Sequence, residues 1–260
     1  MNSSAVVTGA ARGIGRAVAE RLVERGHQVV VTDVDAAVRR TAAEIGAVAG
    51  LVQDVREEAS HAVAAAAALE QAPLAVWVNN AGVGHDGALS ELSSADCELL
   101  LDVNLRGVVW GMRAALDAFG TAGGDIVNIA SLSGLGPVPG LSLYAATKAA
   151  VVSLSAGVDT ETPRSVRVHA LCPDGVDTDM VAAMRPDGLA KALVHSGGGL
   201  LTVDAVADQA VALIGTRRVV RTVPAWRGGV VRATALVPSV AATGIPVFRA
   251  LGRRVIARRH

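Results

Sequence analysis

The sequence has few aromatic residues and almost no lysine. Only 2% of its 260 residues are aromatic, Tyr144 is the single tyrosine, and the two lysines are Lys148 and Lys191. Because 51% of the chain is hydrophobic, its core must be built from alanine, valine and leucine. A tyrosine and a lysine four residues apart would seldom arise by chance in such a composition. We infer that the function of the protein requires a phenol and an amine at these two positions.

Three further absences narrow the class of protein. The two cysteines, Cys97 and Cys172, give no disulfide framework, and Cys172 lies in an apolar run that predicts a core position. No apolar segment reaches membrane-spanning length, and the first apolar run, Ala5–Val7, is too short for a signal peptide. The formal net charge of +0 argues against a nucleic-acid partner. We therefore expect a soluble, cytoplasmic protein without a metal site, comprising one large α/β domain or two small ones.

The stretch from Ser131 to Lys148 carries the central motif. The alanine-rich segment Leu141–Val158 predicts a helix, on which positions i and i+4 share a face. The Tyr144 hydroxyl and the Lys148 ammonium would point into the same space, and the ammonium would lower the pKa of the phenol toward neutrality. Ser131 follows the predicted strand Ile126–Ala130, at the end where open α/β sheets bind ligands. Taken alone, Tyr-x-x-x-Lys is more often part of an ordinary amphipathic helix.

A glycine-rich turn lies near the N-terminus. The predicted strand Ser4–Thr8 leads into the sequence Thr-Gly-Ala-Ala-Arg-Gly-Ile-Gly, and the helical run Arg16–Arg25 follows. Glycines between a strand and a helix let the backbone approach a pyrophosphate, and the helix N-terminus adds free N–H groups and a favourable dipole. No Gly-Lys-Ser/Thr follows, so the turn is not a P-loop. The alternative is a plain strand-to-helix turn with convenient glycines.

Two more predicted strands end in aspartate. Gln28–Thr32 ends at Asp33, about 20 residues after the glycine turn, where a dinucleotide-binding fold places the acid that binds the ribose. Ala47–Gln53 ends at Asp54, which is also a candidate N-cap for the predicted helix Glu57–Glu70.

Asparagines mark two later positions. The predicted strand Leu74–Val78 is followed by Asn-Asn-Ala-Gly, in which the small residues permit a close approach and the Asn80 amide can bridge neighbouring strands. The predicted long helix Leu99–Phe119 contains Asn104, which on its own would be an ordinary surface residue of that helix.

Together these motifs resemble those of the short-chain dehydrogenase/reductase family over about residues 4–224. The resemblance rests on the glycine turn, the Asn-Asn-Ala-Gly signature, the segment Asp102–Gly107, and a serine thirteen positions before Tyr-x-x-x-Lys. It implies an oxidoreductase whose catalytic residues are Asn104, Ser131, Tyr144 and Lys148. In such an enzyme the serine orients the substrate oxygen, the tyrosine is the general acid/base, and the lysine tunes the tyrosine and holds the nicotinamide ribose. The backbone carbonyl of the asparagine holds a relay water.

Strands alternating with helices predict one doubly wound, Rossmann-type α/β domain, with a parallel sheet flanked by helices on both faces. We expect this domain to span residues 1–224 and to end with the helix Val203–Ile214 and the strand Val219–Val223. Within it, residues 179–201 are the least structured stretch and match the family's variable substrate lid. Residues 225–260 would form a basic C-terminal extension.

The resemblance also implies a nicotinamide dinucleotide coenzyme. The residues expected to bind it are Gly9, Arg12, Gly13, Ile14, Gly15, Asp33, Asp54, Val55, Asn80, Ala81, Gly82, Tyr144, Lys148, Pro173, Gly175, Val176 and Thr178. Asp33 suits the ribose hydroxyls of NAD, whereas Arg12 could pair with the 2′-phosphate of NADP. We predict that NAD is preferred, because a 2′-phosphate beside Asp33 would bring like charges together.

One position departs from the family pattern. After the predicted strand Ser165–Leu171 comes Cys-Pro-Asp-Gly-Val-Asp-Thr, in which Asp174 replaces a glycine. Val176 and Thr178 still match the site that holds the nicotinamide carboxamide. The backbone at Asp174 is in question, because glycine tolerates a positive φ better than aspartate does.

The C-terminal extension has no acidic residue, since none occurs after Asp208. The arginines beyond that point are residues 217, 218, 221, 227, 232, 249, 253, 254, 258 and 259. A helix beginning at Pro246 would place Phe248, Leu251, Val255 and Ile256 on one face. Such a helix could lie on an anionic membrane, but we favour packing on the domain or on a partner subunit, because one short helix binds a membrane weakly. We also expect a homodimer or homotetramer.

The residues expected near the substrate are apolar, with no arginine to bind a carboxylate. They are Leu132, Leu135, Val138, Leu141, Met180 and Met184. This lining favours a hydrophobic secondary alcohol or ketone as substrate. One alternative is a 3-oxoacyl-thioester reductase acting on carrier-bound acyl groups, and another is a non-enzymatic NAD(P)-binding regulator on the same fold. The complete catalytic set argues against the regulator.

Overall fold

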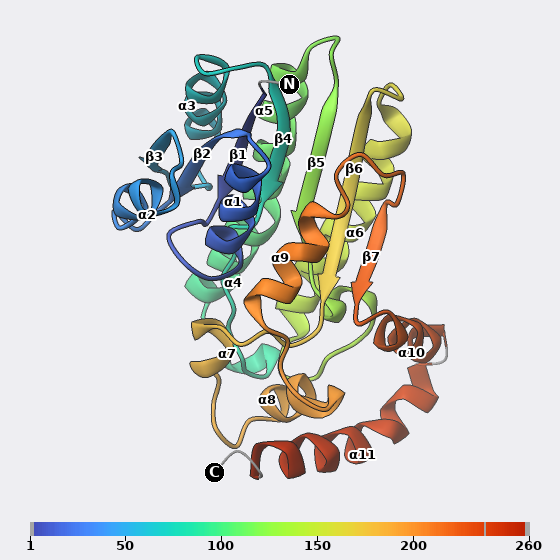
Figure 1. The fold of residues 1–260 in the computed structure, drawn as a ribbon. Coiled ribbons are helices and arrows are strands. Elements are labelled where there is room, and N and C mark those ends of the chain that lie inside the picture. Colours follow the sequence, from blue (N-terminus) through green and yellow to red (C-terminus); the bar gives the residue numbers. More distant parts are fainter. Residues whose placement is uncertain (1–2, 237, 258–260) are drawn as a thin grey trace.

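A computed structural model describes residues 3–236 and 238–257. Its centre is a parallel sheet with the strand order β3-β2-β1-β4-β5-β6-β7 (Figure 1). The strands are β1 (Ser4–Thr8), β2 (Gln28–Asp33), β3 (Ala49–Val52), β4 (Leu74–Asn79), β5 (Gly124–Ile129), β6 (Val166–Pro173) and β7 (Val220–Val223). The predicted doubly wound α/β architecture is therefore confirmed.

Helices cover both faces of the sheet, because successive residues of each strand point to opposite sides. On one face α1 (Gly13–Glu24), α2 (Val38–Ile45) and α9 (Val203–Val211) pack against one set of strand residues, which includes Val7 and Val31. On the other face α3 (Glu58–Leu69), α5 (Gly107–Phe119) and α6 (Ser142–Glu161) pack against the alternate set, which includes Val6 and Val30. Cys172 is fully buried in this second core, as its apolar context predicts.

The predicted strands agree with the structure within two residues at each end, whereas four helices were not predicted. These are α2, α10 (Ala225–Leu236) and two short helices in the segment predicted as the lid. The predicted helix Leu99–Phe119 is instead three elements: α4 (Ser94–Leu101), a π-helical turn η2 (Asp102–Arg106), and α5. In the π turn the Gly107 N–H donates to the Asp102 carbonyl, five residues earlier. The described chain also contains three short 3-10 turns: η1 (Leu89–Glu91), η3 (Leu132–Leu135) and η4 (His195–Gly197).

The segment predicted as the lid is more regular than its sequence indicates. It contains α7 (Asp179–Ala182), α8 (Leu189–Val194) and η4, and all three lie beyond the carboxyl ends of the strands (Figure 1). Val176 and Leu201 form a parallel bridge that joins the beginning of this segment to its end. The lid is therefore a small helical cap whose two ends meet.

The C-terminal extension forms α10 and α11 (Pro238–Ala257), which lie below the carboxyl edge of the sheet in Figure 1. The prediction that a helix begins at Pro246 is wrong, because Pro246 lies inside α11. Arg258 and Arg259, part of the predicted basic tail, lie outside the described residues. Helix α11 packs against α8 and η4, and a side chain at Gly252 would overlap the Ala192 carbonyl. Within the described chain, no helix combines the length and apolarity needed to cross a membrane.

Candidate active site

A cavity of about 1240 Å³ lies at the carboxyl ends of the strands. Pockets that hold one small ligand usually measure about 300–1,000 Å³, so this cavity can accommodate two ligands side by side. Most of the predicted site residues line it. They are Gly9, Arg12, Gly13, Ile14, Asp33, Asp54, Val55, Asn80, Ala81, Gly82, Ser131, Tyr144, Lys148, Pro173, Gly175, Val176 and Thr178. Gly15 and Asn104 do not line it.

The glycine turn between β1 and α1 requires its glycines for three different reasons. Gly9 has φ +64°, and a side chain there would come within 2.6 Å of the Ala81 backbone. Gly13 has φ +60° and faces open space, so it can contact a ligand in the cavity. Gly15, predicted to cradle the pyrophosphate together with Gly9 and Gly13, packs against the Gly9 carbonyl and the Asn80 amide. Its role is to let α1 approach the turn, since even a methyl group there would collide with both.

Asp33 is held in place at the end of β2 by two backbone donors. Its Oδ2 atom accepts from the Ala11 N–H at 3.0 Å, and its Oδ1 atom accepts from the Asp35 N–H at 3.0 Å. Arg12 is already paired, since its guanidinium lies 3.4 Å from Asp35 and 3.1 Å from Asp179. The carboxylate is therefore fixed beside the cavity, whereas the cation of Arg12 is partly neutralised.

The neighbouring strand end differs from the prediction at Asp54. Asp54 is not an N-cap of α3, because its carboxylate binds the Arg56 guanidinium and backbone N–H, and Arg56 holds the pKa of this carboxyl below its usual range. The N-cap position is Glu57, three residues later. Gln53, which was not predicted, lines the cavity, and its buried Oε1 atom has no hydrogen-bond partner among the described residues. An acceptor of this kind matches an amino group of a bound ligand.

Asn80 joins the ends of β1 and β4, as its amide was predicted to do. Its Nδ2 atom donates to the Thr8 carbonyl at 3.0 Å and to the Gly9 carbonyl at 2.8 Å. In return, the Thr8 hydroxyl oxygen accepts from the backbone N–H groups of Asn80 and Ala81. This exchange fixes the small residues Ala81 and Gly82 against the glycine turn.

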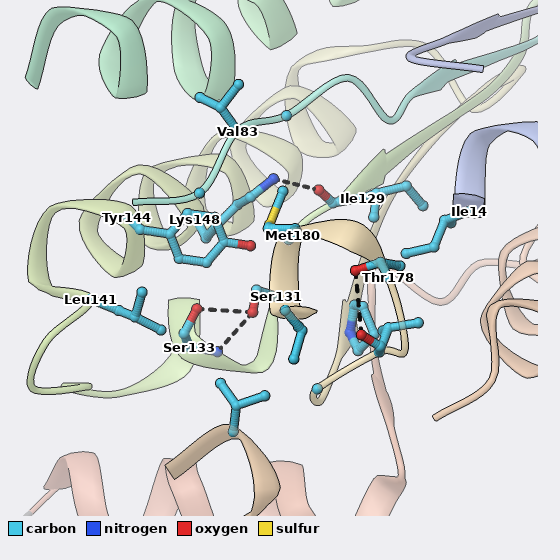
Figure 2. Close-up of a pocket in the computed structure, with 18 of the residues that line it drawn as sticks. Ile14, Val83, Ile129, Ser131, Ser133, Leu141, Tyr144, Lys148, Thr178 and Met180 are labelled. Atoms are coloured by element: carbon cyan, nitrogen blue, oxygen red, sulfur yellow. Dashed lines mark hydrogen bonds between the residues drawn. The ribbon is translucent and has the colours of Figure 1, made fainter. Parts of the chain in front are cut away.

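Ser131, Tyr144 and Lys148 meet in the middle of the cavity (Figure 2). Ser131 lies just beyond β5, and its hydroxyl oxygen accepts from the Ser133 hydroxyl at 2.8 Å and from the Ser133 N–H at 3.2 Å. The Lys148 Nζ atom donates to the Ile129 carbonyl at 2.9 Å and lies 5.7 Å from the centroid of the Tyr144 ring. A helix and a strand end therefore bring a phenol, an ammonium and a hydroxyl together.

The pKa values in this group differ from the prediction for tyrosine. Burial raises the pKa of Tyr144 to about 12, and the interaction with the Ser131 hydroxyl offsets only part of that rise. The prediction that Lys148 lowers the pKa of Tyr144 is thus wrong for this geometry, because desolvation of the phenolate dominates. Burial also lowers the pKa of Lys148 to about 8. At neutral pH the phenol is protonated and the amine is charged, but the amine is close to titration.

Asn104 lies behind the cavity in the π turn and is fully buried, so the alternative of a surface asparagine is excluded. Its Oδ1 atom accepts from the Val83 N–H at 2.8 Å, and its Nδ2 atom donates to the Val83 carbonyl at 2.9 Å. The side chain is therefore committed to the loop after β4. The relay role that the family pattern implies would therefore belong to its backbone carbonyl and not to this side chain.

The segment after β6 accommodates its unusual aspartate without strain. Among the described residues, only glycines have a positive φ, so Asp174 adopts an ordinary backbone conformation. Its N–H donates to the Val223 carbonyl at 2.8 Å, and the Asp177 N–H donates to the Leu201 carbonyl at 2.9 Å. The question raised by the missing glycine is resolved by this geometry.

The C-terminal extension supplies residues that the sequence did not identify as part of the site. Arg227, Val230, Val231, Ile245 and Phe248 all line the cavity. The expectation that no arginine lies near the substrate is therefore wrong, although Arg227 is paired with Asp174 at 2.8 Å. The apolar residues predicted near the substrate also line the cavity, except for one: Leu132, Val138, Leu141, Met180 and Met184 do so, whereas Leu135 packs on the core beside the sheet.

Comparison with known proteins identifies the family. Residues 3–188 match the family described as short chain dehydrogenase. The chain belongs to this family of oxidoreductases, and the resemblance inferred from the motifs is confirmed.

Curated relatives include enzymes with different names. A probable oxidoreductase, EphD, of Mycobacterium tuberculosis is 39% identical over 186 residues, which are 68% of this chain and only 31% of that protein. The chain thus matches less than a third of the length of this relative. The 2,5-dichloro-2,5-cyclohexadiene-1,4-diol dehydrogenase LinX of Sphingobium indicum is 37% identical over 193 residues, which cover 71% of this chain and 77% of that enzyme.

Solved structures show the same fold with either coenzyme. A short-chain dehydrogenase/reductase from Burkholderia phymatum in complex with NAD is 32% identical with a TM-score of 0.81, and covers 89% of this chain and 92% of its own. A variant of the actinorhodin polyketide ketoreductase with NADPH is 29% identical with a TM-score of 0.78. The match covers 87% of this chain and 97% of the ketoreductase chain. The family relationship therefore leaves the coenzyme open.

Proposed function

We propose that this protein transfers a hydride between NAD and a hydrophobic secondary alcohol or ketone. The observation that carries the proposal is the position of Ser131, Tyr144 and Lys148 between the glycine turn and an apolar pocket in one cavity. The glycine turn on one side of the cavity suits a dinucleotide, and the apolar pocket on the other side suits an uncharged organic substrate.

The residues on the coenzyme side fit a dinucleotide. Gly13 opens the turn toward the cavity, Asp33 presents a fixed carboxylate for ribose hydroxyls, and the unpartnered Gln53 acceptor lies next to Asp54 and Val55. When bound, the nicotinamide supplies or accepts the hydride, which is chemistry that no side chain can perform.

The protein residues would manage the substrate oxygen and its proton. In the reducing direction, the protonated Tyr144 donates its proton to the carbonyl oxygen as the hydride reaches the carbonyl carbon. Ser131 donates a hydrogen bond to the same oxygen and so stabilises the charge that develops on it. Lys148 then returns a proton toward the phenolate, and its pKa of about 8 suits this transfer near neutral pH. In the oxidising direction each proton moves the opposite way.

Preference for NAD over NADP is supported by two contacts. Asp33 is held by the Ala11 and Asp35 N–H groups, so it cannot easily turn away from a 2′-phosphate. Arg12 is shared between Asp35 and Asp179, so its charge is not free to compensate that phosphate.

A turnover screen tests the proposal. Purified protein is offered a panel of aryl and alkyl secondary alcohols and ketones with each coenzyme, together with a carrier-mimicking 3-oxoacyl thioester. We expect turnover of the simple hydrophobic alcohols with NAD. Faster turnover of the thioester would favour the acyl-thioester reductase instead. Coenzyme binding without turnover of any panel member would contradict the proposed activity and favour a regulator.

A further inference from the structure

Arg227 is the point at which four separate parts of the chain meet. It lies in α10, and its Nε atom donates to Asp174 Oδ2 at 2.8 Å in the segment after β6. Its Nη2 atom donates to the Ser196 hydroxyl at 3.1 Å, in η4 of the lid. Its guanidinium also lies 5.9 Å from the Phe248 ring of α11. One side chain thus connects the segment after β6, the lid and the C-terminal extension.

This ion pair is built into the wall of the cavity. The side chains of Arg227 and Asp174 are only 7% and 11% exposed, and both line the cavity. Beside them the extension contributes the apolar residues Val230, Ile245 and Phe248. A buried guanidinium is strongly disfavoured without a counter-ion, and Asp174 supplies one where the family pattern has glycine.

We propose that the C-terminal extension forms a wall of the substrate pocket and that the Asp174–Arg227 pair makes this wall electrically neutral, so that the pocket admits uncharged substrates and rejects carboxylates. The inference rests on the proposed function and specifies its substrate class. Without Asp174, the same arginine would present an unpaired cation to the pocket. Without Arg227, the same aspartate would present an unpaired anion.

Two single substitutions should therefore change selectivity in opposite directions. Asp174→Asn keeps an acceptor for Arg227 but removes the negative charge, which leaves the guanidinium able to bind a substrate carboxylate. Arg227→Met keeps much of the side-chain length but leaves the Asp174 carboxylate unpaired, which repels anions further. A purely structural pair would lose activity in both variants without opposite changes in selectivity.

The experiment compares aryl methyl ketones that carry either a carboxylate or its methyl ester on tethers of zero to three methylenes. The tether series allows for the unknown distance between the reacting carbon and Arg227. We expect the wild type to favour the esters. In Asp174→Asn the ratio of acid to ester kcat/KM should rise by at least ~10-fold at one tether length, about 1.4 kcal/mol, whereas in Arg227→Met the ratio should fall.

Asp177→Asn is the matched control, because it removes a carboxylate three residues away that is exposed and lines the same cavity. An equal rise in this control, or no rise in Asp174→Asn at any tether length, would overturn the inference. If Asp174→Asn does not fold, the direction of the change in Arg227→Met decides.

A second measurement does not depend on turnover. The melting temperature of each variant is recorded with increasing concentrations of the acids and of the esters. The acids should stabilise Asp174→Asn and not the wild type or Asp177→Asn, and equal stabilisation of all three would contradict the inference. If the wild type turns over no ketone in the series, the proposed function fails, but this selective stabilisation still tests the charge of the wall.

Discussion

Replacing Asp33 should remove most of the proposed preference for NAD, because in the proposed binding mode this carboxylate would lie beside the 2′-phosphate of NADP. We expect the wild type to favour NAD by at least ~10-fold in kcat/KM, which corresponds to about 1.4 kcal/mol. The structure gives a basis for the size of the effect. Two unit charges 4 Å apart repel by about 4 kcal/mol at an effective dielectric constant of ~20, and solvent at the half-buried Asp33 reduces this value.

Attraction between Arg12 and a 2′-phosphate would offset only part of this repulsion. Its side chain is 69% exposed and already pairs with Asp35 and Asp179. Exposed ion pairs of this kind are worth about 0–1 kcal/mol. We therefore expect the balance to remain on the side of NAD.

Steady-state kinetics with both coenzymes on three sets of variants separate these contributions. Asp33→Asn removes the charge but retains one acceptor, and it should bring the two kcat/KM values to within a few-fold of each other. Val34→Arg, at a residue that is 69% exposed and lines the cavity, adds a cation and should favour NADP when combined with Asp33→Asn. Asp35→Asn with Asp179→Asn releases Arg12 and should raise activity with NADP alone.

Equal kcat/KM values for the two coenzymes in the wild type, or a lead for NADP, would refute this reasoning. A large gain from releasing Arg12, with no effect of Asp33→Asn, would show that the arginine and not the aspartate sets the choice.

Three other outcomes follow from the structure. Tyr144→Phe should lower kcat by roughly 10²–10⁴-fold while NAD still raises the melting temperature, because the ring remains but the transferable proton is lost; near-normal turnover would rule out Tyr144 as the acid. Burial lowers the pKa of Lys148 from 10.5 to about 8, so above pH 8 the unfolded chain binds more protons than the folded one, and stability should rise with pH from 8 to 10 by roughly 2 kcal/mol. Urea unfolding of Lys148→Met should show a flatter dependence over that range, and identical slopes would contradict the shift. The protein should not float with anionic liposomes, because Phe248 on α11 lines the cavity rather than facing outward; salt-sensitive flotation that is lost on deleting residues 246–260 would show the opposite.

The sequence predicted the sheet well because each strand is a short apolar run followed by a marked turn. The positions of Gly9, Asp33 and Ser131 at the carboxyl edge followed directly from that pattern. The proximity of Tyr144 and Lys148 followed from helical spacing, since a helix places residues four apart on the same face, whereas Asn104 and the pairing of Ser131 with Tyr144 followed from the resemblance to the family.

The remaining features depend on contacts between distant segments, which local patterns do not contain. The sequence identifies Arg227 only as one arginine of a basic tail, and it identifies Asp174 only as a departure from the family pattern. The two are 53 residues apart, and only the packing of α10 beneath the sheet brings them together. The predicted lowering of the Tyr144 pKa was wrong for a related reason. Helical spacing indicates which charge is near the phenol, but it does not indicate how deeply the phenol is buried.

The π turn at Asp102–Arg106 has a consequence for how this protein can be stabilised. Helical turns of this type are rare and frequently occur at functional sites. Deleting one residue from the turn would let α4 and α5 join in regular α-helical hydrogen bonding, but it would rotate everything on one side by about 100° relative to the other. Asn104 would then lose its paired hydrogen bonds to Val83. Selection for thermal stability alone would favour such a deletion in the π turn. We expect the product to have a more regular helix but lower enzymatic activity.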